Sequence, residues 1–292
     1  MTRYILALSL ALTAFCPAQE DLRTNLEKTY GIWRAALINK DAATWQRVTA
    51  EHRRVEVRNR ILSEKRAFPA TLFELPAPPP ALGGLKFLEA NQNGATAKSA
   101  YFGKVDFGVG GVPTDNLLVL SFVRGSGGWQ YDKADFVNLT ALPEVRTELA
   151  AGELAYLRGV PEARPSGVVP PTPIAANPAT TIAKVYVFSP GREVQVQINK
   201  ISRHRFANAK EAQIVIGGAR NGLNEVQYSI RKLEGGTGEE ALTIRVYLMS
   251  EIEGLKPFKA FEYLVPEKAT FQPFGTGTFN LDAAMAAKLS GK

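Results

Sequence analysis

Residues 193–199 read EVQVQIN, and this alternation of apolar and polar residues decides the fold of the C-terminal part of the chain. Successive side chains of a β-strand point to opposite faces. The two faces carry Val194, Val196 and Ile198 on one side and Glu193, Gln195, Gln197 and Asn199 on the other. The pattern predicts an antiparallel strand with one face on a core and one face in water.

Similar segments surround this one on both sides. They read IAKVYVF, AQIVIGG, LNEVQYSIRKL, ALTIRVYLM and KAFEYLV, and glycine-rich stretches such as SPGR, GARNG and EGGTGEE separate them. Short, regularly spaced strands of this kind predict an all-β, immunoglobulin-like sandwich over residues 182–292. We expect a short helix, LDAAMAAKL, near its end.

A proline-rich stretch, residues 159–181, precedes the predicted sandwich and reads as a linker. Upstream of it, residues 20–158 predict an α+β domain. Apolar residues at helical spacing predict a helix over residues 20–37, and Asp41 is placed to cap a second helix that carries Trp45. A third helical segment is expected over residues 52–66.

Long strands follow these helices. Asn93-Gly94 and the GSGG stretch are turn signals between alternating segments, so they predict two hairpins and a curved antiparallel sheet. A further helix is expected to begin at Pro143. The order of helix, KDAATW, basic helix and hairpins with LVLSFVRGSGGWQYD resembles the nuclear transport factor 2-like superfamily, in particular its SnoaL-like exported members.

The resemblance implies a cone-like domain in which the bent sheet wraps over the helices around a pocket. Some enzymes of this superfamily place Asp, His or Tyr inside the cone for acid–base work on small apolar substrates. The residues of this sequence that correspond to such a pocket are Trp33, Trp45, Tyr101 and Asp106, with Asp132 and Asp135 as further candidates. Tryptophan in an apolar stripe is more often core than pocket wall, so both readings stay open.

The first eighteen residues predict export. They carry Arg3, an apolar run and then small residues, the pattern of a signal peptide cleaved after Ala18. An acylated Cys16 is the alternative, and with cleavage the mature chain has no cysteine. We therefore expect the periplasm, the cell surface or the extracellular space, with no transmembrane segment in the mature chain.

The net charge of +7 indicates acidic partners. For an exported protein we expect an anionic glycan or an envelope protein and no nucleic acid. The sequence does not predict the oligomeric state. A modest excess of lysine and arginine that merely keeps the protein soluble is the simpler alternative.

Catalytic chemistry finds little support in the sequence. The two histidines, His52 and His204, lie among basic residues without a nucleophile motif, and we expect both to be solvated surface residues. Neither a zinc motif nor a calcium loop is present, so we expect no metal site and no cofactor.

Two basic clusters remain as candidate ligand sites. HRRVEVRNRILSEKR, residues 52–66, reads as a solvated helix face with ion pairs such as Arg60–Glu64. NKISRHRFANAK, residues 199–210, is expected to lie between strands. Its candidate ligand residues are Lys200, Arg203, His204, Arg205 and Phe206. Arginine forks in such a loop would bind carboxylate or sulfate groups.

Together these observations predict an exported, non-catalytic protein whose sandwich is a binding module. Two alternatives stay open. One is a small-molecule carrier or enzyme that uses a hollow cone in the N-terminal domain, and the other is a component of a surface appendage or secretion assembly.

Overall fold

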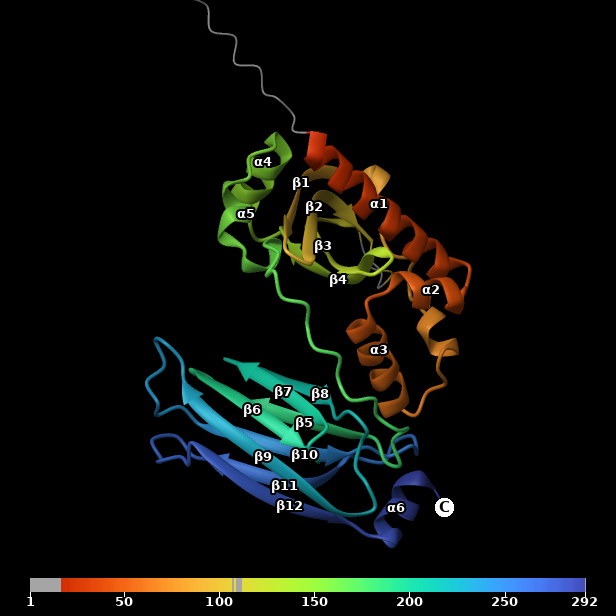
Figure 1. The fold of residues 1–292 in the computed structure, drawn as a ribbon. Coiled ribbons are helices and arrows are strands. Elements are labelled where there is room, and N and C mark those ends of the chain that lie inside the picture. Colours follow the sequence, from red (N-terminus) through yellow and green to blue (C-terminus); the bar gives the residue numbers. More distant parts are fainter. Residues whose placement is uncertain (1–16, 107, 109–111, 292) are drawn as a thin grey trace, which may run out of the picture. The chain divides into compact units, whose positions relative to one another are not determined.

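The computed structural model describes residues 17–106, 108 and 112–291 (Figure 1). The chain divides into two compact units. Unit 1 comprises the described residues of Met1–Ala50 and Leu75–Pro170, and unit 2 comprises Glu51–Glu74 and the described residues of Pro171–Lys292. Apart from Pro17 and Ala18, the predicted signal peptide lies outside the described residues.

Unit 1 contains helices and one antiparallel sheet, as expected for an α+β domain. Its elements are α1 (Pro17–Ile38), α2 (Ala42–Val48), β1 (Lys86–Asn93), β2 (Thr96–Val105), β3 (Thr114–Gly125), β4 (Gly128–Asn138), α4 (Pro143–Ala151) and α5 (Ala155–Gly159), with short 3-10 turns at Leu82–Gly84 and Pro161–Ala163. The strand order is β1-β2-β3-β4. Both predicted hairpins are confirmed, and Asp41 caps α2 by accepting a hydrogen bond from the Thr44 amide at 2.9 Å.

Helices cover both faces of this sheet (Figure 1). On one face, Leu118 and Leu120 of β3 pack in a cluster with Leu26 and Tyr30 of α1. On the other face, the neighbouring strand residues pack in a second cluster with leucines of α4 and α5. The cone expected from the superfamily resemblance stays a prediction, and in the structure the sheet lies between two helical layers.

Unit 2 contains two four-stranded antiparallel sheets. Its strands are β5 (Ala183–Phe188), β6 (Arg192–Ile198), β7 (Ser202–Ala207), β8 (Lys210–Ile214), β9 (Gly222–Lys232), β10 (Leu242–Leu248), β11 (Phe258–Val265) and β12 (Phe274–Leu281), followed by α6 (Ala283–Ser290). The orders are β11-β10-β5-β8 in one sheet and β12-β9-β6-β7 in the other. The predicted strands and the terminal helix are therefore present.

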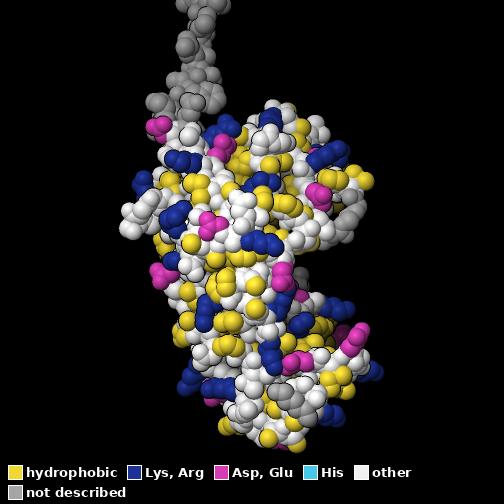
Figure 2. Space-filling model, turned by 90° about the vertical axis from the view of Figure 1, so that its right-hand side faces the viewer, with side chains coloured by type: hydrophobic (Ala, Val, Ile, Leu, Met, Phe, Trp, Pro, Cys, Tyr) yellow, Lys and Arg dark blue, Asp and Glu magenta, His cyan; other side chains and the backbone are white. Residues whose placement is uncertain are grey.

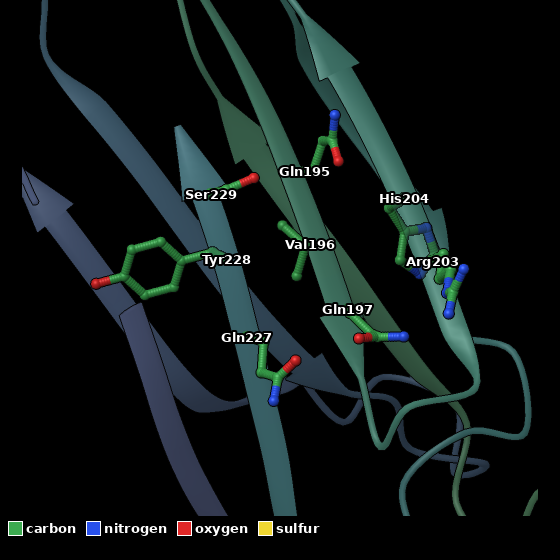
Figure 3. Close-up of a pocket in the computed structure, with 8 residues that line it drawn as sticks. All are labelled: Gln195, Val196, Gln197, Arg203, His204, Gln227, Tyr228 and Ser229. Atoms are coloured by element: carbon green, nitrogen blue, oxygen red, sulfur yellow. The ribbon is translucent and has the colours of Figure 1, made fainter. Parts of the chain in front are cut away.

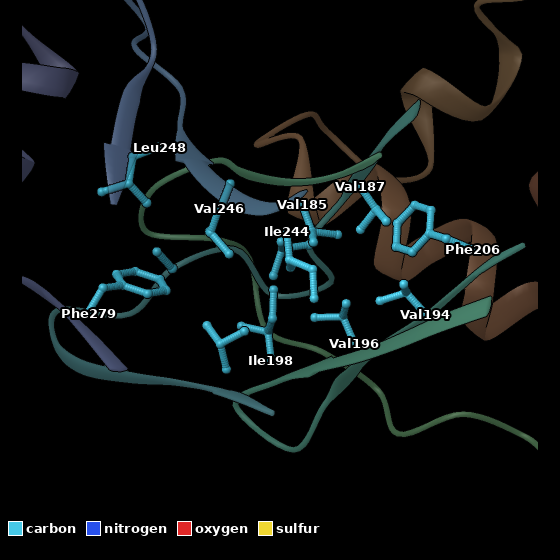
Figure 4. Packing of buried hydrophobic residues seen from close by; sticks show 14 of the residues in the cluster. Val185, Val187, Val194, Val196, Ile198, Phe206, Ile244, Val246, Leu248 and Phe279 are labelled. Carbon is cyan, nitrogen blue, oxygen red and sulfur yellow. The ribbon is translucent and has the colours of Figure 1, made fainter. Parts of the chain in front are cut away.

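The inner faces of both sheets share one apolar core (Figure 4). Val194, Val196 and Ile198 of β6 lie in it together with Ile244 and Val246 of β10, and all five are almost completely buried. The apolar face predicted for the EVQVQIN segment is confirmed. Of the residues predicted to face water, Gln195 is exposed and Gln197 is half-buried, whereas Glu193 and Asn199 are buried, because Glu193 is paired with Arg205 and Arg231 and Asn199 lies in the turn after β6. Two sheets that bury one face each form a sandwich. Its immunoglobulin-like character stays a prediction.

Unit 2 also includes α3 (Glu51–Ser63) and the 3-10 turn Ala70–Phe73, which the sequence places in the N-terminal domain. Buried polar bonds hold this helix to the stretch that leads into the sandwich. The Asn59 amide donates to the Ile174 carbonyl and accepts from the Ala176 amide, both at 2.8 Å. The boundaries predicted at 20–158 and 182–292 miss this exchange because hydrogen bonds between residues over 100 positions apart leave no local pattern.

Candidate functional site

The candidate site is the outer face of the sheet β12-β9-β6-β7. The basic segment SRHRF was predicted to lie between strands, and the structure corrects this, because these residues belong to β7. Alternation along the strand exposes Arg203 and Arg205, whereas His204 and Phe206 are buried toward the core. Lys200 is exposed in the turn before β7, with a left-handed φ of 63°. Of the five predicted ligand residues, the two arginines therefore share this face.

Strand register arranges the outward-pointing side chains in two rows across the sheet. One row contains Arg203, Gln197, Gln227 and Thr276, and the other contains Arg205, Gln195, Ser229 and Phe274. We call these eight residues the outer face. A shallow hollow of about 330 Å³ lies on it, lined by the three glutamines, Ser229 and Arg203 among others (Figure 3).

The two arginines differ in what they can offer a ligand. Arg205 donates to the buried carboxylate of Glu193 at 2.5 and 2.9 Å, and Arg231 donates to the same carboxylate at 2.7 and 3.0 Å. Hydrogen bonds from Arg231 and Arg205, with a further one from Gln195, lower the pKa of Glu193 to about 2. Within the described part of the chain, Arg203 has no hydrogen bond or ion pair, so its guanidinium is open to an anion.

Behind this face, His204 belongs to a buried polar chain. Its Nε2 lies 2.6 Å from the Ser202 hydroxyl, and its Nδ1 lies 2.9 Å from the Gln213 side-chain oxygen. Because that oxygen only accepts, Nδ1 carries the proton and the serine hydroxyl donates to Nε2. The Ser202 hydroxyl also accepts from the Ile216 amide at 2.7 Å. These hydrogen bonds join β7 to β8. Because Ser202 is fully buried, its hydroxyl is not available to solvent as a nucleophile.

Neither histidine is the solvated residue that the sequence predicts. His204 is 8% exposed and His52, at the start of α3, is 3% exposed. Alternation along β7 points His204 inward, and burial lowers its pKa. Protonation would place an uncompensated charge at the edge of the core.

The residues predicted for a pocket in unit 1 do not line one cavity. Trp33 packs against Tyr131, with ring centroids 3.9 Å apart, and Trp45 and Tyr101 are buried. The Tyr101 hydroxyl donates to Glu27 at 3.2 Å, and burial raises the pKa of this tyrosine. Side chains fill the space between α1 and the sheet.

The acidic residues predicted for that pocket also lie apart from it or have other partners. Asp106 is exposed at the end of β2, where its carboxylate accepts from the Gly108 amide at 2.8 Å. Asp135 pairs with Lys133 at 2.8 Å, and Asp132 is buried beside a bulge in β4.

Metal and membrane features can be stated for the described residues only. Among them, no group of three or more His, Cys, Asp or Glu side chains is arranged to hold a metal ion. No described helix has the length and apolar character needed to cross a membrane.

Several outer-face residues were missed in the sequence. Gln227, Ser229, Thr276 and Phe274 alternate with inward-facing residues in LNEVQYSIRKL and FGTGTFNL, which is the same signal that located Gln195 and Gln197. Alternation identifies a polar face on each strand, but it does not show which strands are neighbours. The order β12-β9-β6-β7 joins segments about 80 residues apart.

Comparison with known proteins identifies no relative of this chain. No family model matches the chain, and no curated protein and no solved structure is significantly similar to it. The case for function therefore depends on the geometry of the outer face.

Proposed function

We propose that this protein is an exported, non-catalytic binding protein whose outer face takes an anionic polysaccharide. The observation that carries the proposal is Arg203, an exposed guanidinium without a partner among the described residues, in a row with Gln197 and Gln227. Export is supported by the signal-peptide pattern of residues 1–18.

The chemistry of the outer face fits this ligand class. Glutamine amides and the hydroxyls of Ser229 and Thr276 can both donate and accept, as sugar hydroxyls require. The Arg203 fork matches a carboxylate or a sulfate with two parallel hydrogen bonds. Phe274, which is 75% exposed, ends the second row and offers an apolar surface to the face of a sugar ring.

The distribution of charge favours a ligand that is recognised by specific hydrogen bonds over one that is attracted only by a large basic surface. On the surface seen in Figure 2, lysine and arginine side chains are interspersed with acidic and apolar ones. Near the outer face, Glu193 compensates Arg205 and Arg231. The net charge of +7 therefore adds long-range attraction, and the polar rows supply the contacts.

The test is binding of the purified protein to heparin and to uncharged dextran at low and physiological salt. We expect heparin binding that weakens with salt, and weak or absent binding to dextran. Arg203→Ala is expected to reduce heparin affinity about tenfold or more, since charged hydrogen bonds contribute about 1.5–3 kcal/mol. Arg220→Ala, an exposed arginine outside the outer face, is the matched control.

Equal losses in the two arginine variants would show that charge alone drives binding and would overturn the assignment to this face. Absence of binding at either salt would reject the polysaccharide and direct attention to envelope proteins as partners.

A further inference from the structure

The free edge of β12 differs from the other edges of the sandwich. Strand edges expose unpaired backbone groups, and proteins commonly protect them with charged side chains. The charged pairs on three edges are Arg203 and Arg205 on β7, Lys210 and Glu211 on β8, and Lys259 and Glu262 on β11. The eight residues of β12, FGTGTFNL, include no charged residue.

Packing explains only part of this composition. A Cβ atom at Gly275 would lie 2.4 Å from the Tyr228 hydroxyl oxygen, and one at Gly277 would lie 2.3 Å from the Phe261 ring. Glycine is therefore required at both inward positions. Thr276 and Thr278 are exposed, and nothing in their packing prevents a lysine or glutamate there.

The hydrogen-bond phase of β12 shows which residues the edge offers. The Ile230 amide donates to the Pro273 carbonyl at 2.7 Å, so Pro273 and every second residue after it bond to β9. The backbone groups that point to the free edge belong to Phe274, Thr276, Thr278 and Asn280. Within the described ranges no other strand or loop bonds to that side of β12.

We propose that a second copy of this chain pairs with β12 through a twofold antiparallel contact centred on Gly277. In this register, Thr276 lies opposite Thr278 of the partner subunit, and Phe274 lies opposite Asn280 of the partner subunit. The backbone groups of all four edge-directed residues then form hydrogen bonds with the partner strand. A twofold contact of this kind is self-complementary and closed, which favours a dimer over a fibre.

The same register places exposed apolar side chains in one row across the contact. Phe274 and Leu223 are 75% and 68% exposed and lie on the same face of the sheet. Leu223 pairs with Asn280 within its own sheet. Across the twofold contact, Phe274, Asn280 of the partner subunit and Leu223 of the partner subunit follow one another in a row over three strands, so at both ends of the contact Asn280 lies between the two apolar side chains.

The first test is light scattering during size-exclusion chromatography of the purified protein over a concentration series. We expect a mass that rises from monomer to dimer. In the double variant Thr276→Lys/Thr278→Lys, lysines face lysines across the contact, and we expect loss of the dimer. Ala207→Lys, on the exposed edge of β7, is the matched control and is expected to keep the dimer.

A monomer at every concentration, or a dimer that survives the double lysine change, would overturn the proposal. Circular dichroism of each variant shows that the fold is retained. Thr278→Pro removes one edge-directed amide and changes none of the eight outer-face residues. It is expected to be monomeric and to keep Arg203-dependent heparin binding, so failure of the dimer and failure of the polysaccharide proposal give different results.

The register has a separate test in a Cys16→Ser background, where no native cysteine remains. Thr276→Cys and Thr278→Cys proteins are oxidised singly and as a mixture. Residues directly opposite in a hydrogen-bonded pair have Cα atoms about 5.5 Å apart, within the range for a disulfide. We expect cross-linked dimers mainly in the mixture, and equal cross-linking in all three samples would contradict the register.

Discussion

The sheet of unit 1 and the β12-β9-β6-β7 sheet of unit 2 are both four-stranded and antiparallel, yet they bury their residues differently. In β3 of unit 1, eight consecutive residues are buried, because helices cover both faces. In β7 of unit 2, buried and exposed residues alternate along the whole strand. A sheet that is covered on both sides has no face left for a ligand, so the open polar face lies in unit 2.

Substitutions of residues adjacent in a strand test this comparison, and they have the largest expected effect on the free energy of unfolding. Leu117 and Leu118 are fully buried on opposite faces of β3, so Leu→Ala at either position should cost about 2–5 kcal/mol of unfolding free energy. In β6, Ile198→Ala should cost a similar amount and Gln197→Ala less than about 0.5 kcal/mol. Urea denaturation measures all four changes. A large loss for Gln197→Ala, or a small one for either leucine, would contradict the comparison.

The helix α3 gives a second, smaller test, because it belongs to unit 2 although it precedes the sheet of unit 1. Asn59→Ala removes bonds to two backbone groups, the Ile174 carbonyl and the buried Ala176 amide, and should cost about 1–3 kcal/mol. We expect faster hydrogen exchange in α3 and in residues 174–180, with peptides of unit 1 unchanged.

Arg60→Ala is the matched control on the same helix, since the Arg60 side chain is 74% exposed. It should leave the exchange pattern close to that of the parent protein. If Asn59→Ala changed exchange mainly in unit 1, the division between the units would have to be redrawn.

Local patterns predicted the elements well. The alternation in EVQVQIN, the Asn93-Gly94 turn and the Asp41 cap each depend on residues close in sequence, and each is confirmed. The segment SRHRF was not recognised as a strand. Its inward residues include Ser202 and His204, which are polar, so the apolar half of the alternation is weak there.

The arrangement of the elements could not be predicted in the same way. The second helical layer of unit 1 depends on how α4 and α5 fold back onto the sheet, and the rows of the outer face depend on strand order. Hydrogen bonds between Asn59 and the residues near 175 also join distant segments. Single arginines were identified from charge, but whether each has a partner depends on Glu193.

The pairing of Glu193 predicts a third, pH-dependent effect that concerns the open face. Its pKa in the folded state, about 2, lies below the ordinary 4.5, so the folded protein binds fewer protons than the unfolded chain between these values. Stability contributed by this carboxylate is full above pH 4.5 and is lost as the pH falls toward 2. Glu193→Gln should lack this part of the acid loss in urea denaturation at stepped pH.

An exposed glutamate serves as the control for that measurement. Glu234→Gln should retain the acid loss of the parent protein. If the unfolding free energies of Glu193→Gln and the parent protein fell in the same way with decreasing pH, Arg205 and Arg231 would not hold the carboxylate as the structure indicates.

His204 supplies the smallest expected effect and tests the buried side of the same strand. Burial lowers its pKa from 6.5, so below pH 6.5 the unfolded chain takes up a proton that the folded protein does not. Stability from this group is therefore present above pH 6.5 and falls as the pH decreases. His204→Asn should flatten the pH dependence of unfolding below 6.5, whereas Ser202→Ala, which leaves the imidazole buried, should keep its slope. An unchanged slope in His204→Asn would mean that the histidine is hydrated in the folded state and that β7 is open on both of its faces.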